Sequence, residues 1–77
     1  MSKTREVLNK LSERQQTYLR ALAANAIEME RRGFTHVYEE RKGTARGYIK
    51  GLVDCGMIEE TDFRVLWVWW SVLLLEV

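Results

Sequence analysis

The sequence lacks proline, and its 77 residues include one cysteine, Cys55, and one histidine, His36. A single cysteine excludes an internal disulfide. A single histidine with no second soft ligand near it excludes a structural zinc site. A domain this small has a modest core and usually needs a disulfide, a metal or a partner chain as a supplement. The sequence therefore favours burial against another chain as the supplement, and the alternative is a small fold that stands alone.

Long apolar runs and leader segments are also lacking. The most apolar stretch, residues 65–75, is interrupted by Ser71 and is shorter than the ~20 residues that a membrane-spanning helix needs. The N-terminal segment MSKTREVLNK has no apolar run behind its basic residues, unlike a secretory signal. We therefore expect a cytoplasmic protein without a membrane interaction.

Motifs that carry chemistry are a third absence. The sequence has no glycine-rich phosphate loop, no nucleophile elbow and no metal-ligand spacing. The neighbouring carboxylates Glu39 and Glu40 would diverge on a helix and cannot share a proton. The acidic residues Glu59, Glu60 and Asp62 cluster at an expected helix start, where carboxylates stabilise the helix dipole. We predict no catalytic, cofactor-binding or metal-binding residue, and therefore a protein that is not an enzyme.

Two glycines provide the clearest local signals. Residues 31–34 (RRGF) and 54–57 (DCGM) each end a helix-like run with a glycine followed by a large apolar residue. This order is typical of a Schellman stop, in which the glycine is left-handed and the apolar residue folds back onto the helix. We predict two helix ends, with positive φ at Gly33 and Gly56.

The first predicted helix ends at Gly33 and begins either near Thr4 or at Ser12. Ser12 and Gln15 have the spacing of a capping box, so residues 5–11 form either a separate turn or part of the same helix. Apolar residues at three- and four-residue steps predict the face that this helix buries: Leu8, Leu11, Tyr18, Leu22 and Met29.

The second predicted helix covers residues 35–55 and is either continuous or broken at residues 43–44. Gly43, Gly47 and Gly51 recur every four residues within it, although each glycine in a helix costs about 1 kcal/mol relative to alanine. We expect them to pack closely against the alanine-rich residues 21–26. The alternatives are a smooth surface that admits a partner beside Arg46, or a helix that begins later.

The last predicted element covers residues 63–77, with Thr61 as a candidate N-cap. Its valines and tryptophans are typical of a strand, but it is long for a strand, whose usual length is about 5–6 residues. As a helix it has two apolar stripes. One contains Phe63, Trp67, Trp70, Leu74 and Val77. The other contains Val65, Val68, Val72 and Leu75, with Trp69 beside it.

Two partner helices in so short a chain cannot cover both stripes of this segment. A helix that is apolar nearly all round is buried on nearly all sides, so the second stripe needs a cover from outside the chain. We predict a protein interface, used for homo-oligomer formation or for binding a different protein, at Val65, Val68, Trp69, Val72 and Leu75.

Basic residues gather in the middle of the chain. Four of them form a candidate patch for nucleic acid or for an acidic partner: Arg41, Lys42, Arg46 and Lys50. The plain alternative is a solvated helix face.

Residues 44–63 (TARGYIKGLVDCGMIEETDF) resemble a pattern of small uncharacterised proteins from bacteriophages and mobile elements. Such proteins include inhibitors of host enzymes and of bacterial defence systems, which implies a protein that acts by covering a surface. Residues 52–58 (LVDCGMI) also resemble the end of a recognition helix and the first wing strand of a winged helix-turn-helix protein. That second resemblance implies a DNA-binding transcriptional regulator, although Glu39 and Lys42 depart from its apolar pattern.

The sequence thus predicts one all-α domain over residues 1–77, with three helices, that self-associates through its C-terminal helix. We expect a phage-type inhibitor that contacts protein in a bacterial defence or nucleic-acid-processing complex, and that needs no cofactor. The alternative is a winged helix-turn-helix regulator whose C-terminal segment is a strand.

Overall fold

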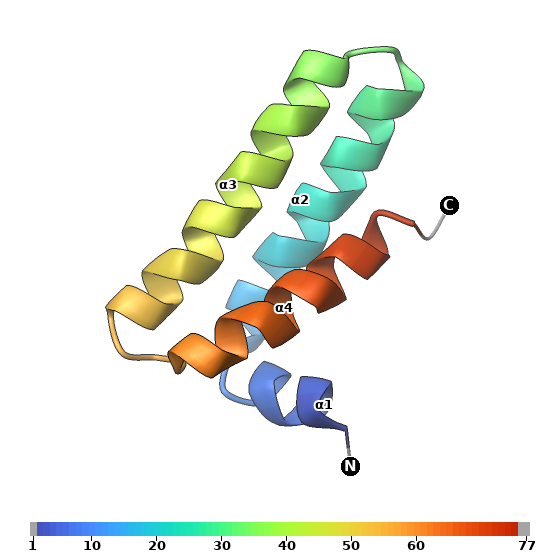
Figure 1. Cartoon of the computed structure of the whole chain (residues 1–77). Coiled ribbons are helices and arrows are strands. Elements are labelled where there is room, and N and C mark those ends of the chain that lie inside the picture. Colours follow the sequence, from blue (N-terminus) through green and yellow to red (C-terminus); the bar gives the residue numbers. More distant parts are fainter. Residues whose placement is uncertain (1, 76–77) are drawn as a thin grey trace.

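The computed structural model describes residues 2–75 and contains four α-helices. They are α1 (Lys3–Leu8), α2 (Glu13–Arg31), α3 (Thr35–Asp54) and α4 (Glu60–Leu73). In Figure 1, α2 and α3 lie side by side as an antiparallel hairpin, α4 crosses the hairpin, and α1 lies against α4. The predicted all-α class is confirmed, with a short fourth helix at the N-terminus.

The winged alternative is wrong for the described part of the chain. Residues 2–75 contain no strand, and the segment proposed as a strand forms α4 instead. The segment proposed as a first wing contributes Ile58, which is buried in the core next to the turn before α4. Its backbone N–H donates to the carbonyl of Leu52, so it continues the end of α3 and pairs with no strand.

Local signals set the starts of the helices. The Ser12 hydroxyl accepts from the Gln15 N–H at 3.1 Å, and the Gln15 side chain accepts from the Ser12 N–H at 2.9 Å, so the capping box is confirmed. The residues before it form the separate helix α1. Thr61 is not the N-cap. The N-cap is Glu59, two residues earlier, and its N–H donates to the Asp62 carboxylate at 3.0 Å.

Both glycine stops are confirmed. Gly33 and Gly56 each have a φ of 82°. The Phe34 N–H donates to the Met29 carbonyl at 2.9 Å, and the corresponding N–H of Met57 donates to the carbonyl of Leu52 at 3.0 Å. These are the hydrogen bonds of a Schellman motif, and they place the sharp turns on either side of α3.

The core lies between the hairpin and α4. Its buried residues are Val7, Leu11, Leu19, Ala23, Ala45, Ile49, Leu52, Ile58, Leu66 and Trp70. The face that α2 buries differs from the predicted one, because Leu19, Ala23 and Ala26 are its buried residues. Tyr18 is 42% exposed, because its ring leaves the core and lies 4.8 Å from that of Tyr48 on α3. The small residues Ala23 and Ala26 are buried in its place, which leaves room for the large side chains of α4.

The glycines inside α3 are exposed, and the helix is continuous through residues 43–44. A Cβ atom added to Gly43, Gly47 or Gly51 would meet nothing within 4 Å. The expected close packing against the alanines is therefore wrong. Helical periodicity correctly places the three on one face, but that face is the one opposite Ala45 and Ile49, which are buried.

A buried carboxylate ties the N-terminus of the chain to α4. Asp62 has no exposed surface, and its Oδ2 accepts from the Lys10 ammonium at 2.7 Å. The Lys3 ammonium lies 3.9 Å from Oδ1. The hydrogen bond from Lys10 and that from the Glu59 N–H lower the pKa of Asp62, against the effect of burial. The same Lys10 contact raises the pKa of the Lys10 ammonium.

We expect Asp62→Asn to lower the free energy of unfolding by about 1–2 kcal/mol at pH 7, since it removes a hydrogen bond to a charged group. Because the folded pKa lies below the unfolded value of about 3.9, the carboxylate stabilises the fold above that value. This contribution is lost as the pH falls through the folded pKa. Urea denaturation at pH 7 and at pH 3 should therefore show the variant's deficit shrinking in acid.

The matched control is Glu60→Gln, which removes an exposed carboxylate from the same turn. It should leave the free energy of unfolding within about 0.5 kcal/mol of the wild type. A deficit of Asp62→Asn that is equal at both pH values would show that the charge of Asp62 has no part in stability.

Candidate protein-binding surface

Three tryptophans fix the orientation of α4 on the hairpin. Trp70 is fully buried between the helices. Trp67 stacks on it with 5.5 Å between ring centroids, and the Arg46 guanidinium of α3 lies 6.0 Å from the Trp67 ring. On the other side, the Arg20 guanidinium of α2 lies 5.2 Å from the Trp69 ring. These contacts occupy three sides of α4 and leave its outer side to solvent.

The outer side of α4 is apolar. Val68, Val72 and Leu75 are 55%, 47% and 78% exposed. They belong to the stripe that the sequence predicts as an interface. Val65 and Trp69, the other two predicted interface residues, are half-buried and pack against the core. Val68, Val72 and Leu75 of the predicted stripe are therefore exposed, whereas Val65 and Trp69 contribute to the core.

The first predicted stripe of α4, which begins at Phe63, is only partly buried. Phe63, Trp67 and Leu74 are half-buried, Trp70 is buried, and Val77 lies outside the described residues. The deepest line of the helix runs through Asp62, Leu66 and Trp70. Leu66 was assigned to neither stripe, although its position four residues before Trp70 was the signal for it.

An apolar groove lies beside the exposed stripe. It opens between the N-terminal half of α3 and the C-terminal half of α4, which diverge away from their connecting turn (Figure 1). Its volume is about 490 Å³, and it is lined by Tyr38, Lys42, Trp67, Val68, Ser71, Val72, Leu74 and Leu75. Tyr38 was missed from the sequence, because only the divergence of the two helices brings it to this surface.

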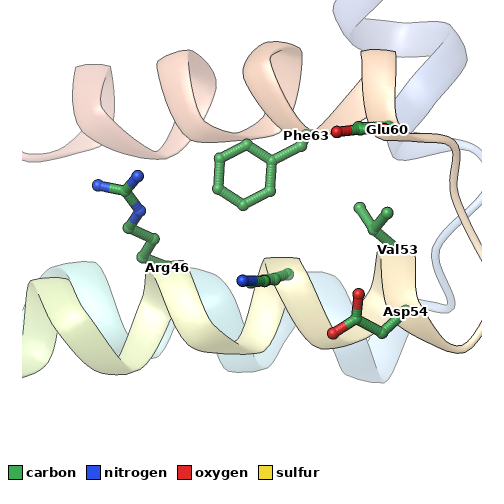
Figure 2. Close-up of a pocket in the computed structure, with 6 residues that line it drawn as sticks. Arg46, Val53, Asp54, Glu60 and Phe63 are labelled. Atoms are coloured by element: carbon green, nitrogen blue, oxygen red, sulfur yellow. The ribbon is translucent and has the colours of Figure 1, made fainter.

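A second, more polar groove lies nearer to the turn between α3 and α4. It has a volume of about 500 Å³ and is lined by Arg46, Lys50, Val53, Asp54, Glu60 and Phe63. In Figure 2, Arg46 extends from α3 toward α4, and the Phe63 ring projects from α4 into the space between the helices. Two cations and two carboxylates line this groove, so it favours no ligand of a single charge.

The structure brings together three of the four residues in the predicted basic patch. Lys42, Arg46 and Lys50 recur every four residues on the side of α3 that faces the two grooves. Arg41 faces α2 instead, where its Nε donates to the Asn25 side chain at 2.7 Å. The Lys42 ammonium lies 3.6 Å from the Glu39 carboxylate and 5.3 Å from the Tyr38 ring.

Residues 2–75 contain neither a metal-binding cluster nor a membrane-crossing helix. No group of three or more His, Cys, Asp or Glu side chains in this range is placed to hold a metal ion. None of the helices found there is both long enough and apolar enough to cross a bilayer.

No protein-family model matches the chain, and neither a curated protein nor a solved structure shows significant similarity to it.

Proposed function

We propose that the protein is a non-enzymatic domain that binds another protein through the outer side of α4 and the adjoining apolar groove. The observation that supports this is the continuity of exposed Val68, Val72 and Leu75 with a concave wall containing Trp67 and Tyr38. Soluble domains rarely leave such apolar surface open without a use for it. An amphipathic helix of a partner protein commonly binds in an apolar groove of this kind.

The size of the chain supports the same proposal. A domain of this length has a net stability of only about 5–15 kcal/mol. Covering apolar surface contributes roughly 25 cal/mol per Å², so a partner over α4 would add stability that the small core lacks. The same contact would provide affinity for the partner.

For the target, we propose a protein of a bacterial defence or nucleic-acid-processing complex, whose surface the domain covers as an inhibitor. The support is the resemblance of residues 44–63 to small proteins of bacteriophages and mobile elements. Direct DNA binding is less well supported. The cations of α3 alternate with Glu39, Asp54 and Glu60 around the grooves, which interrupts a track for phosphates.

The test is a comparative affinity capture from cells that contain the protein. The double variant Val68→Lys/Val72→Lys places two charges on the exposed stripe. The matched control, Thr44→Lys/Gly51→Lys, adds the same charge to exposed positions on the outer side of α3. We expect the stripe variant to retain at least about tenfold less of a partner than the wild type and the control do, because buried unpaired charge opposes association.

Equal retention of the same partner by the stripe variant and by the control would contradict the proposed surface. So would an equal loss from both variants, because position on the molecule would then have no effect.

A further inference from the structure

The exposed stripe of α4 is surrounded by positive charge. Four basic side chains from three helices border it: Arg20 of α2, Lys42 and Arg46 of α3, and Arg64 of α4. Arg64 is exposed and lies one helical turn before Val68 on the same side of the helix. Arg20 and Arg46 are held at the two edges of α4 by their contacts with Trp69 and Trp67.

Within residues 2–75, carboxylates lie near two of these cations: Glu39 near Lys42, and Asp54 and Glu60 in the groove that Arg46 lines. The sequence of α4 has no acidic residue after Asp62, and Asp62 is buried on the opposite side of the helix. Within residues 2–75, no carboxylate lies within 4.0 Å of the guanidinium of Arg20, Arg46 or Arg64. Lys42 has one such neighbour, Glu39 at 3.6 Å. The stripe is therefore an apolar surface with a basic rim.

We propose that the occupant of this surface is an amphipathic α-helix of a different protein, with acidic residues on both flanks of its apolar side. This inference rests on the protein-binding function proposed above and specifies the chemistry of the partner. Complementary charge across an interface favours the right partner and penalises the wrong one. Acidic flanks would pair with Lys42 and Arg46 on one edge and with Arg20 on the other.

The shape of the surface favours a helix. Val68 and Val72 are spaced i, i+4 on α4, roughly 6 Å apart at the 1.5 Å rise of a helix, and Leu75 follows in the turn after α4 ends at Leu73. A helix lying along α4 presents anchors at the same spacing. The described residues offer no sheet edge, so an extended peptide has no backbone partner on this molecule.

A second copy of the chain fits this surface less well. Symmetric pairing across α4 would bring the four basic side chains of each copy to one interface, where among residues 2–75 only Glu39 lies within 4.0 Å of one of them. Like charges brought together in this way oppose association. A bilayer also fits less well, because Val68, Val72 and Leu75 are the only large aliphatic side chains among residues 2–75 that are exposed on or just after α4, and Trp70 is buried in the core.

Two synthetic peptides of about 18 residues, long enough to form a helix on binding, provide the test. Both carry leucines at i, i+4 and i+7 on an alanine background. One has glutamates on both flanks, and the other has lysines. Because neither contains tryptophan, binding can be followed by the fluorescence of Trp67 and Trp69. At about 0.15 M salt, we expect the acidic peptide to bind at least tenfold more tightly.

The matched variants are Arg64→Glu and Arg14→Glu. Both reverse an exposed charge in the N-terminal half of a helix, but Arg64 lies one turn before Val68 on α4, whereas Arg14 lies near the start of α2. We expect Arg64→Glu to lower the affinity for the acidic peptide at least about threefold and to raise the affinity for the basic peptide. Arg14→Glu should leave both affinities within about twofold of the wild type, since distant exposed charges are screened.

Equal affinities for the two peptides would overturn the acidic specificity while leaving a protein-binding surface in place. Failure of both peptides to bind at millimolar concentration would overturn the helical occupant, whereas the capture experiment tests the surface separately. Two further results would also overturn the inference. They are a stable dimer that Val68→Lys/Val72→Lys dissociates, or tight binding to vesicles of anionic phosphatidylglycerol with neither peptide bound.

Discussion

Replacing Trp70 with alanine is expected to lower the free energy of unfolding by about 3–5 kcal/mol. Trp70 is the largest fully buried side chain and belongs to the core cluster that also contains Leu19 of α2 and Ile49 of α3. Its Nε1 also donates to the Leu19 carbonyl of α2 at 2.8 Å, a buried contact between elements far apart in the sequence. Removing the indole therefore creates a cavity and removes a hydrogen bond together. Chemical denaturation followed by circular dichroism measures the loss.

Two comparison variants separate these contributions. Trp70→Phe keeps most of the apolar volume and removes the donor, so we expect a smaller loss of about 1–2 kcal/mol. Val72→Ala, on the exposed side of the same helix, should cost less than about 1 kcal/mol. If Trp70→Ala were as stable as Val72→Ala, Trp70 would not be the centre of the core.

Replacing the glycines inside α3 is expected to stabilise the protein. Changing Gly43, Gly47 and Gly51 together to alanine should raise the free energy of unfolding by about 2–3 kcal/mol, because each glycine costs nearly 1 kcal/mol in a helix. The added methyl groups meet no neighbouring atom within 4 Å. The gain comes from the smaller conformational freedom of the unfolded chain.

Gly56→Ala is the matched control for this triple variant. It makes the same chemical change at a φ of 82°, where an L-residue is strained. We expect it to lower the free energy of unfolding by about 1 kcal/mol. A triple variant less stable than the wild type would contradict the exposed position of these glycines.

Features that depend on neighbouring residues were predictable from the sequence. The stops at Gly33 and Gly56 and the box formed by Ser12 and Gln15 involve groups within five positions of one another, so local order alone defines them. The helix in the last segment followed from the length of that segment, which exceeds the usual length of a strand.

Features that depend on how the helices cross were not predictable. The contact of Lys10 with Asp62 joins residues that are distant in the chain, and a carboxylate at a helix start has a sufficient local explanation without it. Periodicity showed that Gly43, Gly47 and Gly51 share a face, but it did not show which face is exposed.

The part of the candidate surface that depends on the periodicity of α4 alone was predictable from the sequence. Counting two apolar stripes on one helix was enough to identify Val68, Val72 and Leu75 as uncovered. The half-buried state of Trp69 depends on Arg20 of α2, and the contribution of Tyr38 depends on the angle between α3 and α4. Neither relation is present in the periodicity of a single segment.

The central claim is that α4 uses one side for the core and leaves the other for a partner. The free energy of unfolding of Val68→Lys/Val72→Lys, measured by chemical denaturation, tests it most directly. Lysine has a higher helix propensity than valine and can keep its charge in water. We therefore expect the variant to fold, with a free energy of unfolding within about 1 kcal/mol of the wild type. A loss of about 3 kcal/mol or more, comparable to that of Trp70→Ala, would show that both sides of α4 belong to the core.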